Sequence, residues 1–307
     1  TLRVKEPAQV RQPGRKEKSE EAKPAQTIET AKPTTLPTEE PPRPNLLAKA
    51  DSLYAVAVSK YTAGELAAAK AGCEEALALY KNANSNAKIG KVQRMLATIL
   101  FHQDVLSIAK QMFEEAESML QRAGEREEMA LATIGRARVF VEQKKSDEAE
   151  SMLKQTVAKN PEGNAAAGMY GLLSSLAVIS GKTDDGRQYL QQADRQHVRG
   201  RDAMIDMLLE IARARYDAAS GKTAAEMRTE LQTAVARAGD VASSLEMKYT
   251  IAELASEYLN RTAQPRFQRN PRRGAMQSGQ RVEAVRSEAA SKGFTLIARK
   301  TSELPLR

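Results

Sequence analysis

Apolar residues recur at helical spacing from Leu46 to about residue 260. They fall at positions i, i+3, i+4 and i+7, which places them on one face of an α-helix. Short breaks interrupt the pattern and contain Gly64, Lys144, Gly181 and Gly221. Aromatic residues make up only 4% of the chain and Trp is absent, whereas Ala, the strongest helix former, is abundant. The pattern predicts an all-α fold built from pairs of helices.

The predicted helix pairs resemble one another. Four of them share a motif in the second helix. It begins with a small residue, continues after three intervening positions with a larger residue, and ends after two more with Ala or Thr. A small residue lets two helices approach closely, and the larger residue fills the gap between them. The four copies are Ala69-x3-Cys73-x2-Ala76, Ala109-x3-Phe113-x2-Ala116, Ala149-x3-Leu153-x2-Thr156 and Gly186-x3-Leu190-x2-Ala193. The preceding turns lie near residues 64, 104, 144, 181 and 221, which gives a repeat of about forty residues.

This pattern resembles the tetratricopeptide repeat (TPR), whose second helix carries A-x3-F-x2-A and often a closing proline, here Pro161 after the third copy. Leu96-Ala97 followed by Leu100, and Ala137 followed by Phe140, match the packing positions of the family's first helix. The period exceeds the family's usual ~34 residues and is similar to that of long-repeat bacterial regulators. The resemblance covers residues 46–260. It implies a right-handed α-solenoid of about five to six helix pairs, each packed only against its neighbours. Generic HEAT or armadillo packing is the alternative.

Residues 1–45 have a different composition from the repeats. They hold eight of the twelve prolines and almost no large apolar side chain. Such a segment cannot bury enough surface to offset the entropy of ordering. We expect a disordered linker that acts as a spacer, with a proline-rich ligand for a partner domain as the alternative. Because a linker joins two parts, the chain is expected to be a processed product or a piece of a longer protein.

The C-terminal end carries the basic excess. Residues 261–307 contain eleven Lys or Arg and three Asp or Glu, whereas residues 46–260 contain 27 and 29. We expect repeats over 46–263, a basic loop over 264–275 and capping helices over 276–307, with Gly293 ending one of them. The loop could contact an anionic partner, a nucleic acid or a membrane surface. An ordinary solvated loop is the alternative. The candidate contacts are Arg266, Arg269, Arg272 and Arg273.

A second resemblance concerns cellular context. Residues 289–300 and 211–221 look like segments from the C-terminal TPR tails of bacterial eukaryotic-like Ser/Thr kinases and related signalling proteins. That resemblance implies a module that is periplasmic or tethered to a bacterial membrane protein. A single cysteine is compatible with the cytoplasm as well, so both compartments stay open.

The sequence offers little for catalysis. One Cys and two His exclude a disulfide framework and the usual zinc sites. Ser180-Gly-Lys-Thr183 and Ser220-Gly-Lys-Thr223 resemble the end of a P-loop, but Leu176 and Tyr216 stand where its first glycine is needed. We interpret both as turns between helices, with Thr223 and Glu226 forming a capping box. No enzyme activity and no cofactor are expected.

The family's concave face gives the candidate binding residues. In TPR proteins the first helix of each pair lines that face, and the resemblance maps its peptide contacts onto this chain. Arg and Lys there could clamp a carboxylate; ordinary surface residues are the alternative. We expect an interaction scaffold or sensor that binds a protein or peptide, with a structural subunit of an envelope assembly as another possibility. The residues are Tyr54, Lys91, Arg94, Thr98, His102, Arg138 and Arg215.

Overall fold

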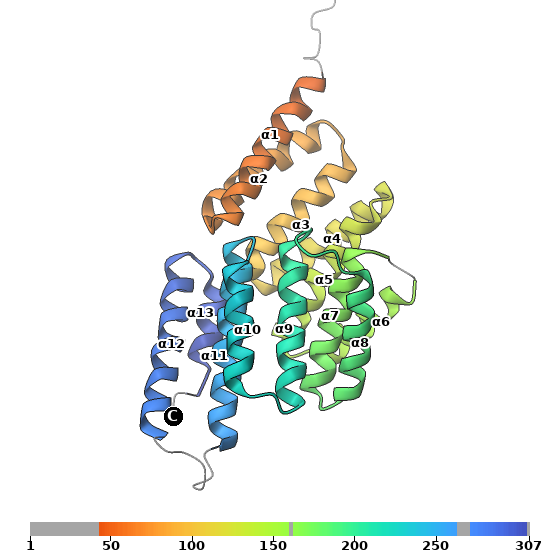
Figure 1. The fold of residues 1–307 in the computed structure, drawn as a ribbon. Coiled ribbons are helices and arrows are strands. Elements are labelled where there is room, and N and C mark those ends of the chain that lie inside the picture. Colours follow the sequence, from red (N-terminus) through yellow and green to blue (C-terminus); the bar gives the residue numbers. More distant parts are fainter. Residues whose placement is uncertain (1–42, 160–161, 263–270, 306–307) are drawn as a thin grey trace, which may run out of the picture. The chain divides into compact units, whose positions relative to one another are not determined.

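The computed structural model describes residues 43–159, 162–262 and 271–305, and every regular element in these ranges is an α-helix (Figure 1). The helices form antiparallel neighbours in chain order, as the periodicity predicts, and give a TPR-like stack. They are α1 (Arg43–Thr62), α2 (Leu66–Asn82), α3 (Asn86–His102), α4 (Leu106–Ala123), α5 (Arg126–Glu142), α6 (Ser146–Val157), α7 (Asn164–Ile179), α8 (Thr183–Gln196), α9 (Ala203–Ala219), α10 (Ala224–Ala236), α11 (Val241–Thr262), α12 (Pro271–Ser291) and α13 (Thr295–Ser302).

The turns are set by single residues with left-handed backbone. In the first repeats these residues are Gly64, Asn84, Asp104, Gly124 and Lys144, one every 20 residues. At Asp104 the chain reverses between α3 and α4. The Asp104 N–H donates to the Phe101 carbonyl at 3.0 Å and the Val105 N–H to the Leu100 carbonyl at 2.9 Å. These bonds satisfy carbonyls that the end of a helix leaves open. The turns predicted near 64, 104, 144, 181 and 221 are confirmed.

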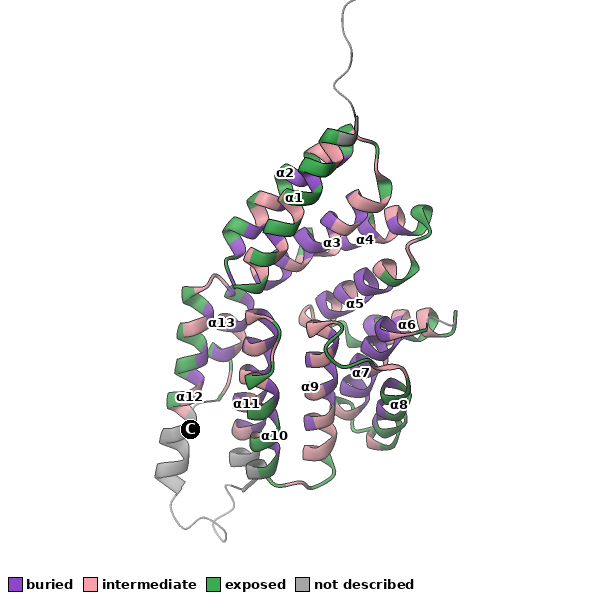
Figure 2. Ribbon diagram, turned by 45° about the horizontal axis from the view of Figure 1, so that its top comes forward, coloured by how far each residue is buried: buried purple, intermediate pink, exposed green. Residues whose placement is uncertain are grey.

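The repeated packing motif lies in the core. Ala69, Cys73 and Ala76 are fully buried in α2, and Ala109, Phe113 and Ala116 are buried in α4. Burial raises the pKa of the Cys73 thiol to about 12, so this cysteine packs as an apolar residue. A fifth copy, Met227-x3-Leu231-x2-Ala234 in α10, is also buried. Sequence reasoning missed it because Met227 is not small. Figure 2 shows burial concentrated in α3, α5 and α7 and exposed stretches on α8.

The expectation that each pair packs only against its neighbours is wrong. The last helices return to the first: α11 contacts α1, and α13 contacts α3. Leu245 of α11 and Ile297 of α13 share a hydrophobic cluster with residues of α1, α2 and α3, and Leu296 packs with Leu100. The sequence of each repeat specifies how it packs on the next helix pair. Contact between the last helices and the first depends instead on the rotation accumulated over all the pairs.

The C-terminal region differs from the expected boundaries. Helix α12 begins at Pro271, so residues 271–275 are helical where a loop was expected. Proline is tolerated there because a helix's first N–H groups have no partner within the helix. Arg266 and Arg269 lie outside the described residues, as do the side chains of Arg272 and Arg273. Of the linker expected over 1–45, residues 1–42 also lie outside them, whereas residues 43–45 already belong to α1. Gly293 has left-handed backbone after α12.

A candidate binding pocket on the first helices of the repeats

A pocket of about 90 Å³ lies between α5, α7, α9, α11 and α13; we call it the inner pocket. Its apolar wall includes Leu172, Leu176 and Ile179 of α7 and Leu208 and Ile211 of α9. Consecutive first helices of the repeats pack on one another, so the apolar stripes of α7 and α9 form one continuous wall. Ile179, at the end of α7, is 60% exposed. Ile179 therefore extends the apolar wall of the pocket to the solvent.

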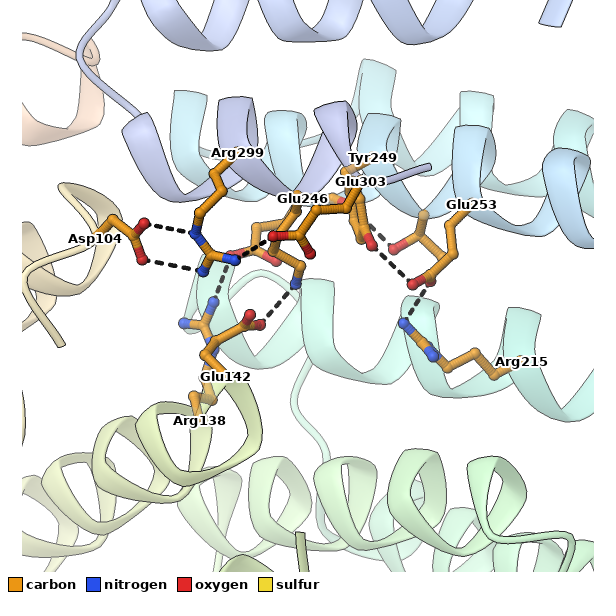
Figure 3. Close-up of polar contacts among 11 residues, drawn as sticks. Asp104, Arg138, Glu142, Arg215, Glu246, Tyr249, Glu253, Arg299 and Glu303 are labelled. Carbon is orange, nitrogen blue, oxygen red and sulfur yellow. Dashed lines mark hydrogen bonds and ion pairs between the residues drawn. The ribbon is translucent and has the colours of Figure 1, made fainter. Parts of the chain in front are cut away.

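Charged groups form the opposite wall, and they are paired (Figure 3). The Arg138 guanidinium of α5 donates to Glu246 of α11 at 2.6 Å, and both side chains are buried. The guanidinium also lies over the Phe101 ring, 4.5 Å from its centroid. Burial alone would raise the pKa of Glu246, but the positive charges around it, Arg138 first and then Lys300 and Arg215, lower that pKa overall. The carboxylate therefore stays charged inside the protein.

Two further pairs hold the C-terminal helices to the repeats. Lys300 of α13 donates to Glu142 of α5 at 2.6 Å and lies 4.6 Å from the centre of the Tyr249 ring. Arg215 of α9 donates to Glu253 of α11 at 2.6 Å. Lys300, Glu142, Tyr249 and Arg215 all line the inner pocket. A molecule that enters the pocket would therefore contact the same side chains that attach α11 and α13.

Of the seven residues proposed from the family resemblance, Arg138 and Arg215 line the inner pocket. Lys91 and Arg94 lie elsewhere on α3 and both pair with Glu128, Arg94 at 2.8 Å. The Thr98 hydroxyl donates to the Arg94 carbonyl. Sequence reasoning treated the four cations as free to clamp a peptide carboxylate. In the structure, each already has a carboxylate of this chain as partner.

Two of the seven are aromatic or heteroaromatic and largely buried. Burial raises the pKa of Tyr54, which lies on α1 near Arg94. His102 is 1% exposed, which leaves no surface for a peptide to touch in this conformation. Its Nε2 is 3.1 Å from the Tyr61 hydroxyl, and its ring lies 5.2 Å from that of Phe294. Burial, followed by the charges of Arg138 and Lys300, lowers the His102 pKa to about 3, so the imidazole is neutral.

Sequence reasoning missed Glu142, Glu246, Tyr249 and Lys300. It treated α11 as one more repeat helix and α13 as a cap. Glu246 lies 108 positions from Arg138 and Lys300 lies 158 positions from Glu142, so no local pattern connects them. The only signal in the sequence was that Arg138 stands at a family position on the concave face. That position indicates the surface but does not indicate which carboxylate pairs with Arg138.

Two properties of the described residues bear on chemistry and context. They contain no group of three or more His, Cys, Asp or Glu side chains arranged to hold a metal ion. None of their helices has the length and apolar character that a bilayer span requires. The Thr223 hydroxyl accepts from the Glu226 N–H while the Glu226 carboxylate accepts from the Thr223 N–H, which confirms the capping box at the Ser220–Thr223 turn.

No protein-family model matches the chain, and a search of curated proteins finds no match. Solved structures do resemble it. A Rap protein complexed with competence and sporulation factor aligns with a TM-score of 0.64 and 16% identity over 80% of this chain and 66% of its own. The Rap conjugation gene regulator of plasmid pLS20, in complex with the Phr* peptide, aligns at 0.60 and 11% over 78% and 64%.

Aspartyl phosphate phosphatase F from Bacillus subtilis aligns with a TM-score of 0.59 and 15% identity over 76% of this chain and 60% of its own. The chain thus spans between 60% and 66% of the length of these three proteins. At such identities the likeness concerns the fold: this chain is an all-α protein of TPR-like helical repeats.

Proposed function

We propose that this chain is a non-catalytic interaction module that binds a peptide or a protein segment at the inner pocket. One observation carries the proposal: the pocket joins an apolar wall, with Ile179 exposed, to charges supplied by both the repeats and the C-terminal helices. Short peptides bind helical repeats through apolar anchors and a few charged contacts. Two of the structurally similar Rap proteins were solved in complexes, one of them with a peptide.

The charges favour a ligand that is itself amphipathic. Arg138, Arg215 and Lys300 face the pocket together with Glu142 and Glu246. Each of these charges is already neutralised within the protein, so a ligand of one sign would have to break a pair. A peptide segment with one apolar side chain, a carboxylate and an amine could separate one of these ion pairs. Its carboxylate would then pair with the protein's cation and its amine with the protein's carboxylate, so that neither charge is left unpaired.

A peptide library displayed on phage tests the proposal. Immobilised full chain should enrich a family of related sequences that contain an apolar residue. Ile179→Asp should abolish their binding while leaving the fold intact, because this side chain is 60% exposed. Ile108→Asp on α4 is the matched control, since Ile108 is 50% exposed and lies outside the pocket. Peptides that bind both variants equally well would show that the inner pocket is not their site.

We also propose a context for the module. The resemblance of residues 289–300 to the tails of bacterial kinases supports attachment to a membrane-anchored signalling protein, with the repeats outside the cytoplasm. Fractionation of cells that carry an epitope-tagged copy of the intact gene tests this. Recovery of the tag in the cytosolic fraction alone would contradict it.

A further inference from the structure

A second and larger concavity lies on the other side of α9. It measures about 490 Å³ and is lined by α9, α10 and the loop that precedes α9. An adjoining pocket of about 240 Å³ shares Arg199, Glu210 and Arg237 with it. We call the larger one the arginine groove. On α9 it is lined by Glu210, Arg213 and Asp217, whereas the inner pocket uses Leu208, Ile211 and Arg215. The two sites therefore occupy different faces of one helix and share no lining residue.

Three guanidinium groups converge on a single carboxylate in the arginine groove. Arg199, Arg213 and Arg237 lie 3.2, 3.5 and 3.7 Å from the same oxygen of Glu210. They come from three separate elements: the loop before α9, α9 itself and the residue that ends α10. Guanidinium groups repel one another, so their convergence indicates a place where negative charge is stabilised.

One carboxylate does not balance three arginines. Asp194 of α8 takes up part of the charge of Arg213, at 2.5 Å. Among the described residues, however, Glu210 is the only ion-pair partner of Arg199 and Arg237, whose side chains are 57% and 54% exposed. The other acidic residues of the groove, Asp217 and Glu230, are both held by Lys222. The arginine end is therefore left with excess positive charge.

The donors available there match a phosphoryl group. Each guanidinium carries five N–H donors in a planar fork, and contacts to one carboxylate use only some of them. A phosphate monoester carries a charge of about −1.5 to −2 at pH 7 and three strongly accepting oxygens, which suit paired arginines. Beyond the arginines the groove is lined by Ala214 and Leu231, which are 4% and 2% exposed and close its floor, and by Thr229 and Thr233 on α10. Its volume falls in the range of about 300–1,000 Å³ typical of small-molecule sites.

We propose that the arginine groove binds a small organic phosphate. Its phosphoryl group lies between Arg199 and Arg237, with Arg213 beneath, and its organic portion extends along the groove beside Thr233 of α10. The assignment is independent of the peptide proposed for the inner pocket. It also concerns a part of the chain distinct from the basic residues 266–273.

Calorimetric titration of the full chain with phenyl phosphate and with inorganic phosphate, at constant ionic strength, tests the proposal. We expect saturable binding of both, with phenyl phosphate the tighter ligand. Chloride at the same ionic strength measures simple screening. Affinity for inorganic phosphate equal to or above that for phenyl phosphate would overturn the assignment of an organic ligand, and absence of saturable binding would overturn the site.

A pair of variants with equal net charge locates the site. Arg199→Gln with Arg237→Gln removes two charges from the groove at exposed positions. Arg122→Gln with Arg187→Gln removes two charges from exposed positions on α4 and α8 outside the groove. The first variant should bind phenyl phosphate at least about tenfold more weakly, the effect of losing roughly one charge-assisted contact. The second should bind like the unaltered chain. Equal losses in both would show that net charge alone is responsible. Circular dichroism confirms that both variants are folded.

Discussion

Arg299 binds both carboxylate oxygens of Asp104, across 195 positions of sequence. Its Nε donates to Oδ2 at 2.6 Å and its Nη2 donates to Oδ1 at 3.1 Å (Figure 3). Asp104 is also the left-handed residue of the turn between α3 and α4, with φ of 61°. One side chain thus reverses the chain in an early repeat and anchors the last helix.

Asp104→Asn should separate these two roles. Asparagine keeps the tolerance for left-handed backbone, so the turn remains, but its neutral amide loses the charge-assisted pairing with Arg299. The side chain of Arg299 is 37% exposed and that of Asp104 is 24% exposed, so solvent screens the pair. We expect a loss of about 1 kcal/mol in the free energy of unfolding. Urea titration measures it. Arg286→Ala, which removes an exposed pair within α12, should cost much less; a similar cost would contradict the anchoring role.

The buried pair of Arg138 and Glu246 should behave differently from an exposed pair. Arg138→Met alone leaves a carboxylate buried without its partner, and we expect a loss of about 3–5 kcal/mol. Arg138→Met combined with Glu246→Leu should recover much of that loss, because two apolar side chains need no compensation. A double-mutant cycle on Lys70 and Glu74, an exposed pair at 3.8 Å, should give coupling near zero. A double variant as unstable as the single one would contradict this account.

His102 should make stability depend on pH. The folded chain keeps the imidazole neutral down to its pKa of about 3, whereas the unfolded chain takes up a proton below about 6.5. Between these values the unfolded state binds more protons, so stability rises with pH and falls on acidification. The contribution approaches about 1.4 kcal/mol per pH unit in the middle of that window. Urea midpoints at pH 7 and pH 5 should show a smaller drop in His102→Gln than in the unaltered chain.

Glu117 affects the pH dependence of stability in the opposite direction, so the contribution of His102 is isolated by comparing the unaltered chain with His102→Gln. Burial raises the pKa of Glu117 to about 7 against an ordinary 4.5, so the folded state holds the extra proton and stability falls as pH rises through that range.

Nuclear magnetic resonance gives a second readout of the His102 protonation state, and it does not require that the variant folds. The His102 ring should keep the resonances of a neutral imidazole down to pH 4. Titration near pH 6.5 would contradict its burial.

Gly135→Ala should destabilise the protein even though alanine favours helix. A Cβ at Gly135 would overlap the ring of Phe113, the large residue of the second packing motif. Overpacking of this kind costs about 1–3 kcal/mol. Gly279→Ala in α12 is the control, because a Cβ there meets open space and the change should stabilise by about 0.5–1 kcal/mol. Phe113→Leu should relieve part of the effect in the double variant. Equal behaviour of the two glycines would rule out the steric explanation.

Local features were predictable from the sequence because short-range forces set them. Helical periodicity, the spacing of small residues around Cys73 and Phe113, and the turn at Gly181 each depend on neighbours a few positions away. The motif at Met227 was missed because its packing position accepts a larger residue in this context. The resemblance to TPR proteins supplied Arg138 and Arg215 as candidate contacts.

The composition of the pocket was not predictable in the same way. Arg138 and Arg215 are neutralised by Glu246 and Glu253, which only the return of α11 brings near. The buried ring of His102 packs against Phe294 of the segment before α13 as well as against Tyr61 and Phe101. Both contacts depend on the rotation between successive helix pairs, accumulated over several repeats. No short segment of sequence encodes this accumulated rotation.

The contact of α11 and α13 with α1 and α3 carries a consequence for synthesis. A ribosome releases the earliest helices long before it reaches Phe294 and Leu296, whose side chains complete the core around Leu100 and His102. The first helices therefore emerge with part of their apolar surface uncovered and wait for translation of the last. Completion of this part of the core depends on residues 294–296, whereas an open array could fold from its first repeat onward.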